Sequence, residues 1–261
     1  MGEHPPLTGR AALVTGVSRR RGIGFAVASR FAAMGAGPVI HHHCPHDMAE
    51  YGSADDVEAL LEDLRAMQPG DAGVAGLSGD LADPVTPAAL VEAARTQLGH
   101  LDVLVCNQAH SGDVVSIRDA SAQAFDRHWA VNARATLLMT QAFAAQHDGR
   151  RGGRVIWMTS GQHLGPMSDN LAYATSKAAL AGITVSVAAD LAESGILLNT
   201  VNPGPVNTGY LDGAPQQFLD AFPAGRAGQP DDPARLIAWL VTDDGAWVVG
   251  QVLNTEGGFR R

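Results

Sequence analysis

The sequence predicts one doubly wound α/β domain over residues 1–261, with a mostly parallel seven-stranded sheet and helices on both faces. Two observations predict this fold. Short, continuously apolar runs, such as residues 155–158, are typical of strands that are buried on both faces. These runs alternate with longer segments of helical periodicity, and such alternation indicates parallel β-α-β units. A length of 261 residues suffices for one such domain.

Composition excludes several classes of partner. The chain is 46% hydrophobic and carries a net charge of −9 without a basic stripe, so we expect neither nucleic acid nor membrane as a partner. Its two cysteines, Cys44 and Cys106, do not suggest a disulfide framework. The first residues form no apolar signal region, and no apolar run approaches the ~20 residues that span a bilayer. We therefore expect a cytoplasmic protein.

The first strand is predicted over residues 10–15, and it leads into a glycine-rich turn and then a helix over residues 25–34. Glycine permits a tight turn and close backbone approach, and a helix N-terminus attracts a pyrophosphate. This order of elements predicts a dinucleotide site. Its expected contacts are Gly16, Ser18, Arg19, Arg20, Arg21, Gly22, Ile23 and Gly24.

The second strand, over residues 38–41, bears on cofactor choice. Folds that prefer NAD often place an acid at the end of this strand, ~20 residues past the glycines. Here that region reads His-His-His-Cys, over residues 41–44, and three arginines occupy the glycine turn. The nearest acid is Asp47. The lack of an acid at the strand end, together with nearby guanidinium groups, favours a 2′-phosphate, so we predict NADP(H), with NAD(H) as the alternative. We expect His43 to line the adenosine pocket; the alternative for the arginines is that they point into solvent.

The run of histidines also raises the question of a metal site. Adjacent residues on a strand point to opposite faces, so His41, His42 and His43 cannot all converge on one ion. Their spacing matches no zinc pattern. We expect no metal.

Four further segments continue the alternation. Residues 55–67 and 85–98 have helical patterns, residues 73–77 form a weak strand, and residues 125–143 form one long helix. Towards the end of the chain, strands are expected over residues 196–201 and 250–254, with a helix over residues 233–241 between them.

The most informative stretch follows the strand expected over residues 154–159. Ser160 comes directly after this strand, and Tyr173 and Lys177 lie four residues apart in a run of helix formers, on one helix face. An ammonium group beside a phenol favours the phenolate and makes the phenol a stronger acid. Such a pair can pass a proton to or from an oxygen atom.

Together these motifs resemble the short-chain dehydrogenase/reductase family. The resemblance rests on Thr-Gly…Gly-Ile-Gly and on a serine thirteen residues before Tyr-x-x-x-Lys, and it extends from about residue 8 to residue 259. The glycine turn departs from the family pattern, with five residues instead of three between Gly16 and Gly22. The resemblance implies a catalytic tetrad of Asn132, Ser160, Tyr173 and Lys177. For Asn132, a purely structural hydrogen bond is the alternative.

The resemblance also implies further cofactor contacts. Asp80 would lie near the adenine, unless it serves mainly as a turn or capping residue. Asn107 is what remains of the family's Asn-Asn-Ala-Gly, and Tyr173 and Lys177 would contact the nicotinamide ribose. The remaining contacts implied are Leu81, Pro203, Gly204, Val206 and Thr208.

On the substrate side, the resemblance implies a mobile lid over residues 205–228. The residues expected to border the substrate are His110, His163, Met167, Asn170 and Tyr210. By the same resemblance the protein assembles as a homotetramer or homodimer.

The pattern is most similar to 3-oxoacyl-carrier-protein reductases and related ketoreductases. This implies hydride transfer from NADP(H) to the carbonyl of a small molecule, which could be attached to a carrier. Three alternatives stay open: an alcohol or sugar dehydrogenase working in the opposite direction, a non-redox enzyme of dehydration or cyclisation, and a cofactor-binding scaffold without turnover.

Overall fold

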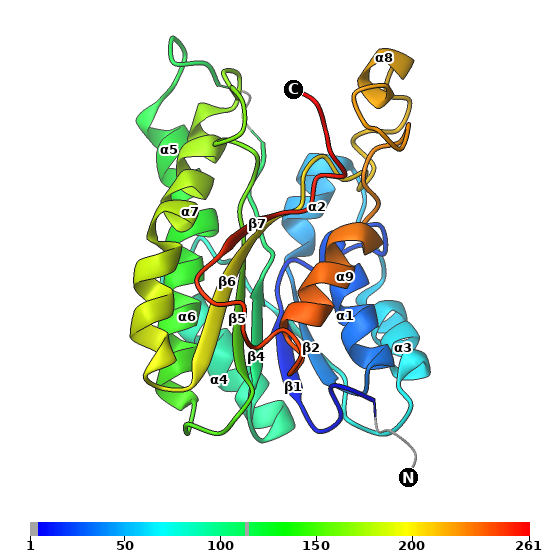
Figure 1. The fold of residues 1–261 in the computed structure, drawn as a ribbon, viewed down its shortest axis with the longest axis vertical. Helices are drawn as coiled ribbons and strands as arrows, with labels where there is room; N and C mark the ends of the chain where they lie inside the picture. Colours follow the sequence, from blue (N-terminus) through cyan, green and yellow to red (C-terminus); the bar gives the residue numbers. More distant parts are fainter. Residues whose placement is uncertain (1–4, 113–114) are drawn as a thin grey trace.

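A computed structural model describes residues 5–112 and 115–261 of the chain. Seven parallel strands form one sheet in the order β3-β2-β1-β4-β5-β6-β7, with helices on both faces (Figure 1). This confirms the predicted fold class. The strands are β1 (Ala11–Val14), β2 (Gly37–His42), β3 (Ala75–Ser78), β4 (Val103–Cys106), β5 (Gly153–Met158), β6 (Ile196–Asn202) and β7 (Val252–Asn254).

The helices form one layer on each side of the sheet (Figure 1). One layer holds α1 (Ile23–Ala33), α3 (Val57–Met67) and α9 (Asp231–Leu240). The other holds α4 (Thr86–Leu98), α6 (Ala135–Gln146) and α7 (Leu171–Ala192). Three shorter elements lie at the carboxyl end of the sheet: α2 (Cys44–Tyr51), α5 (Ala122–His128) and α8 (Gln216–Leu219).

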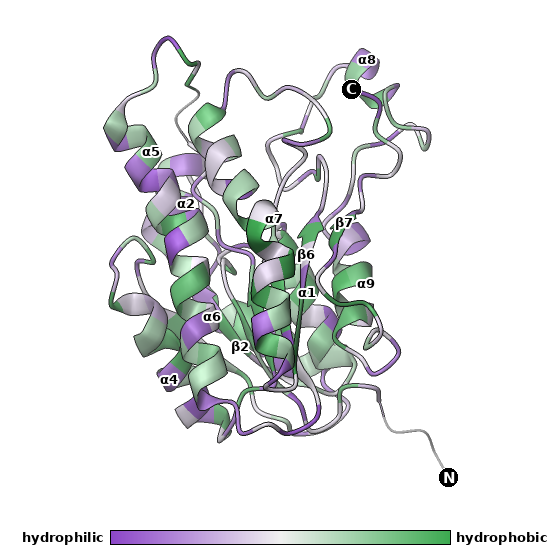
Figure 2. Ribbon diagram, turned by 60° about the vertical axis from the view of Figure 1, so that its left-hand side comes forward, coloured by the Kyte–Doolittle hydropathy of each residue, from purple (hydrophilic) through white to green (hydrophobic). Residues whose placement is uncertain are grey.

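A separate apolar core fills the space between the sheet and each layer. Phe31 on α1 is fully buried in one core, and Trp157 on β5 is fully buried in the other. Alternate residues of each central strand contribute to the two cores, which explains the continuous apolar runs in the sequence. Figure 2 shows these central strands in green, while the surrounding helices alternate between green and purple.

The long helix expected over residues 125–143 is divided into three parts. A π-helical segment, η1 (Trp129–Arg134), joins α5 to α6. Such segments carry an extra residue in one turn and are frequent at functional sites. The sequence pattern did not predict this segment, because an inserted residue shifts the apolar periodicity without ending it.

Helix α7 is the helix of the described ranges that is long and apolar enough, by length and composition, to cross a membrane, with a mean hydropathy of 1.3. The sequence alone predicted no apolar run of this length, whereas α7 has 22 residues. This is weak support for a membrane span, because core helices pass the same test. Here α7 packs against β6 and carries the buried Lys177.

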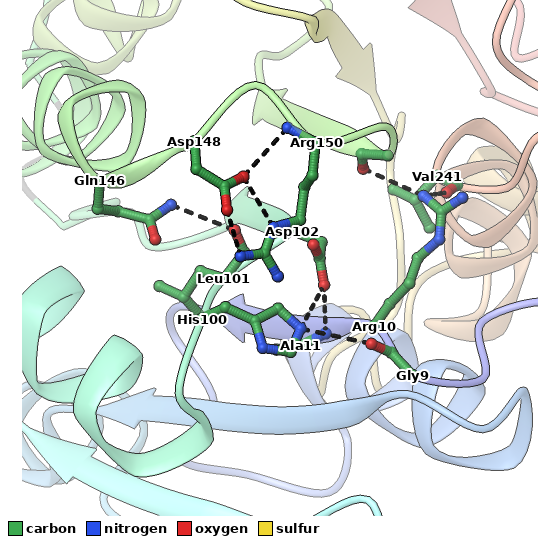
Figure 3. A network of polar contacts seen from close by, with 11 residues as sticks. Gly9, Arg10, Ala11, His100, Leu101, Asp102, Gln146, Asp148, Arg150 and Val241 are labelled. Carbon is green, nitrogen blue, oxygen red and sulfur yellow. Dashed lines mark hydrogen bonds and ion pairs between the residues drawn. The ribbon is translucent and has the colours of Figure 1, made fainter.

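Polar contacts fix the amino ends of the central strands, opposite the expected site (Figure 3). Asp102, which is 4% exposed, accepts a hydrogen bond from the Ala11 amide at 2.9 Å. The same carboxylate lies 3.0 Å from His100 Nε2. Asp102 therefore joins the starts of β1 and β4, the two strands at which the direction of the strand order reverses. In such sheets ligands bind at the opposite, carboxyl end of this pair.

Candidate active site

The glycine turn is anchored to the end of β4 by Asn107. Its Nδ2 donates to the carbonyls of Thr15 and Gly16, at 2.9 and 3.1 Å. A Cβ added to Gly24 would lie 2.7 Å from that Nδ2 and 2.7 Å from the Gly16 carbonyl. Glycine at position 24 thus lets α1 approach the turn closely. No side chain caps the first turn of α1, so its backbone amides suit a pyrophosphate.

A cavity of about 570 Å³ opens beside this turn. It extends from the glycine turn to α2 and to the loop after β4. Of the residues predicted to bind the cofactor, it is lined by Gly16, Ser18, Arg19, Gly22, Ile23, His43, Asp80, Leu81, Asn107 and Thr208. The other residues predicted to bind the cofactor do not line it: Arg20, Arg21, Gly24, Tyr173, Lys177, Pro203, Gly204 and Val206. The cavity also includes His110, which was predicted to border the substrate.

Each arginine of the turn has an acidic partner. Arg19 contacts Asp47 at 3.1 Å, donates to the Thr208 carbonyl at 2.9 Å, and lies 3.6 Å from the ring centroid of Tyr51. Arg20 and Arg21 are exposed and pair with aspartates, Arg21 with both oxygens of Asp212 at 2.7 Å. Arg19 therefore belongs to the cavity wall, whereas Arg21 joins the turn to residues 205–228.

The end of β2 holds neutral histidine. Burial lowers the pKa of His41 to about 4. Its Nδ1 accepts from the Gly16 amide at 3.4 Å and its Nε2 lies 3.0 Å from the Gly79 carbonyl, so Nε2 carries the proton. His43 begins α2, and its amide donates to Ser18 at 3.3 Å. Asp80 caps the following turn by accepting from the Ala82 amide at 2.8 Å, and it also lines the cavity.

Ser160 and Tyr173 meet at the carboxyl end of β5. Ser160 lies two residues beyond the end of this strand, and Tyr173 lies in the first turn of α7. Burial raises the pKa of Tyr173 to about 12, and a hydrogen bond with Ser160 opposes that rise. The lowered tyrosine pKa expected from Lys177 is thus not produced by the protein's own groups.

Lys177 lies one turn further along α7 and is 2% exposed. Its Nζ donates to the Met158 carbonyl at 3.0 Å and lies 5.7 Å from the ring centroid of Tyr173. Burial lowers the pKa of Lys177 to about 8. The lysine is therefore held beside the tyrosine as expected, but its strongest contact is to the end of β5.

Asn132 lies in η1 and is fully buried. Its Oδ1 accepts from the His110 amide at 2.7 Å, and its Nδ2 donates to the His110 carbonyl and to Ser176 Oγ, at 3.0 and 2.9 Å. These bonds use both amide hydrogens of the side chain. Asn132 thus ties α7 to the loop after β4, which is the structural role that the sequence left open beside proton relay.

Two residues that the sequence analysis did not place in the site lie beside Asn132. Gln108 donates to the Val131 carbonyl at 3.2 Å and to Thr136 Oγ1 at 2.9 Å. It thereby ties the loop after β4, where the sequence departs from Asn-Asn-Ala-Gly, to η1 and to the first turn of α6. His128 is fully buried, with ring centroids 4.6 Å from His110 and 6.4 Å from Tyr173. The sequence signal that could have placed His128 in the site is its position four residues before Asn132, on the same side of a helix.

The residues predicted to border the substrate are distributed over several segments. Asn170 is the N-cap position of α7 and forms a β-bridge with Val115. His163 and Tyr210 are exposed, and Met167 is half-buried. Residues 205–228 are irregular apart from α8, and Val206 forms a β-bridge with Gly228. In the described ranges no group of three or more histidine, cysteine or acidic side chains could hold a metal ion.

Comparisons with known proteins agree with this arrangement. The family described as enoyl-(acyl carrier protein) reductase matches residues 16–260. An uncharacterized oxidoreductase, YjdA, of Bacillus subtilis is 36% identical over 259 residues, which cover 97% of each chain. A short-chain dehydrogenase/reductase from Serratia marcescens has a TM-score of 0.85 and 32% identity, covering 97% of this chain and 99% of its own.

A further solved structure bears on the cofactor. A short-chain dehydrogenase from Burkholderia cenocepacia in complex with NADP has a TM-score of 0.84 and 32% identity, covering 97% of this chain and 98% of its own. The fold and these matches define an NAD(P)-dependent oxidoreductase. The chain belongs to the short-chain dehydrogenase/reductase family.

Proposed function

We propose that this protein reduces a ketone to an alcohol with NADP(H), through Ser160, Tyr173, Lys177 and Asn132. The observation that carries the proposal is the convergence of three side chains: the Ser160 hydroxyl opposes the rise in the pKa of Tyr173, and Lys177 Nζ lies 5.7 Å from the Tyr173 ring centroid. These three groups lie at the carboxyl end of the sheet, where a ligand of this fold binds.

The bound cofactor would supply the hydride. In the proposed mechanism Ser160 donates a hydrogen bond to the carbonyl oxygen of the substrate, and Tyr173 gives its proton to the same oxygen. A tyrosine with a pKa of about 12 is protonated at neutral pH, so it is in the form that a reduction requires. The opposite reaction would first require removal of that proton, which this environment opposes.

Lys177 would hold the nicotinamide ribose, and Asn132 would keep the loop after β4 against α7. Because Asn132 already uses both amide hydrogens, we assign it a positioning role. Its Ala variant should therefore lose activity by displacing His110 rather than by breaking a proton path.

The preference for NADP(H) rests on Arg19. Its guanidinium lies on the cavity wall and is 13% exposed, and no acid follows β2 directly. A 2′-phosphate bound to this guanidinium would compete with Asp47, which already pairs with Arg19 at 3.1 Å. The Burkholderia relative, which was solved with NADP, supports the same choice.

The proposal includes three further parts. Residues 205–228 would act as the substrate lid within a single domain, and a carrier-bound ketone is compatible with the open side of the site. The protein would be cytoplasmic and assemble from two or four copies. Exposed apolar side chains support assembly: Trp247 is 97% exposed and Val185 is 69% exposed.

The test is a fluorescence titration with NADPH and NADH, followed by turnover on a panel of ketones. Arg19→Ala should weaken NADPH binding about tenfold or more and leave NADH binding nearly unchanged. Arg20→Ala is the matched control, because Arg20 does not line the cavity. Tyr173→Phe should bind NADPH and lose turnover. Equal weakening by both arginine variants would refute the role of Arg19, and turnover by the Phe variant would refute the tetrad.

A further inference from the structure

The last residues of the sequence pack against the loop that carries Ser160. Figure 1 shows this red segment running from β7 past the carboxyl end of the sheet. Arg261 donates to both carboxylate oxygens of Glu256, at 2.8 and 2.5 Å. Its guanidinium carbon also lies 5.4 Å from the ring centroid of Phe259. A planar guanidinium bound through two hydrogen bonds is held in a fixed orientation.

The side chain of Arg261 lies directly on the residues that follow Ser160. A Cβ added to Gly161 would lie 2.0 Å from Arg261 Nη2, and one added to Gly165 would lie 2.2 Å from Arg261 Cδ. Neither glycine has a positive φ. A side chain at either position would therefore have to displace Arg261, whereas the backbone conformation at neither position requires glycine.

Glu256 extends the contact to a second loop. Its side chain is 8% exposed and accepts from Asn202 Nδ2 at 2.8 Å. Asn202 Oδ1 in turn accepts from the Gly204 amide at 3.0 Å, and a Cβ on Gly204 would lie 2.8 Å from Glu256 Cα. Burial would raise the pKa of Glu256, yet the hydrogen bonds from Arg261 and Asn202 hold it below its usual range.

A third contact joins this segment to residues 205–228. The Phe259 ring lies 4.7 Å from Phe222 and 5.7 Å from Phe218, and the Arg260 amide donates to the Ala221 carbonyl at 2.9 Å. The segment from Glu256 to Arg261 therefore contacts three loops at once: the loop after β5, the loop after β6 and the segment expected to close over the substrate.

We propose that Arg261 is a positioning residue, which holds the loop after β5 so that Ser160 stays in line with Tyr173. This inference rests on the proposed function, in which Ser160 orients the substrate carbonyl. Loss of Arg261 leaves the largely buried carboxylate of Glu256 without its main partner and leaves Gly161 and Gly165 without a packing surface. Both changes displace the backbone beside Ser160, and small displacements of a reacting group cost large factors in rate.

The first experiment compares Arg261→Ala with Arg260→Ala. Arg260 is exposed, and in the described structure it bonds to Ala221 through its backbone amide. We expect Arg261→Ala to lower kcat by about tenfold to a hundredfold while leaving NADPH affinity unchanged. Arg260→Ala should keep wild-type kcat. Arg261→Lys, and millimolar guanidinium added to the Ala variant, should each restore part of kcat. Equal kcat in the two Ala variants, or a parallel loss of NADPH affinity, would overturn the proposal.

A double-mutant cycle tests the contact itself. Gly161→Ala should expel the guanidinium from Glu256, because the new Cβ would occupy its place. We therefore expect Gly161→Ala and Arg261→Ala to be non-additive, with the double variant close to the worse single variant. Additive losses in kcat would show that the two residues act separately and would overturn the proposal.

Hydrogen exchange followed by mass spectrometry gives a readout without turnover. Arg261→Ala should raise the exchange of amides in residues 159–167 and 202–206, whereas Arg260→Ala should not. Unchanged exchange would overturn the positioning role even if activity fell. If the wild-type protein reduced no ketone while exchange rose as expected, the proposed function would fail and the role of Arg261 in holding these loops would stand.

Discussion

Replacing Lys177 with methionine should stabilise the protein while it removes activity. Burial lowers the pKa of Lys177 from 10.5 to about 8. Because one pKa unit corresponds to about 1.4 kcal/mol, carrying the buried charge at neutral pH costs about 3 kcal/mol. Methionine has a similar length and no charge, so it avoids this cost. It also gives up the 3.0 Å hydrogen bond to Met158, which offsets about 1 kcal/mol. A net gain of about 2 kcal/mol is expected.

The sign of this effect depends on pH. Between about pH 8 and 10.5 the unfolded lysine binds a proton that the folded lysine has lost, so wild-type stability rises with pH over this interval. The variant lacks this rise. The advantage of Lys177→Met in urea denaturation should therefore be largest at neutral pH, vanish at about pH 9.5, and reverse to about 1 kcal/mol in favour of wild type near pH 10.5. A variant that is less stable at neutral pH, or an advantage that does not change with pH, would refute the reasoning.

Two further predictions concern the sheet. Wild-type stability should fall by about 3 kcal/mol as pH drops from 6.5 to about 4, because the unfolded His41 gains a proton before the folded one does; urea denaturation of His41→Gln should lack this slope, and identical slopes would contradict the prediction. Asp102→Ala should lower the free energy of unfolding by about 1–3 kcal/mol, because the Ala11 amide loses its buried acceptor. His100→Ala, on the exposed side of the same contact, should cost less, and equal losses would argue against the amide as the cause.

The central strands were predictable because they are buried on both faces. Residues 103–106 and 153–158 are buried throughout, so their apolar character is continuous and independent of their neighbours. The proximity of Ser160 to Tyr173 was predictable for a related reason, while their catalytic role stays a prediction. A strand end and the first turn of the next helix face each other in this fold, so a fixed spacing along the chain becomes proximity in space.

The features that escaped prediction depend on contacts between distant segments. Helix α2 has no buried residue, so its sequence lacks the apolar periodicity that would predict a helix. The pairing of Arg19 with Asp47 and of Arg21 with Asp212 depends on where two loops meet. The same holds for Arg261, which lies 100 positions from Gly161 in the sequence and contacts it in the fold.

The π-helical segment has a consequence for the register of the whole helix from α5 to α6. One extra residue turns everything before it by roughly 100° relative to an uninterrupted α-helix. Removing one residue from η1 would leave α6 in its place on the sheet and rotate α5 about its axis. His128 would then turn away from Tyr173, although both residues would still be present in the chain. The π-helical segment therefore determines how far α5, which faces the site, is rotated about the helix axis relative to α6, which packs in the core.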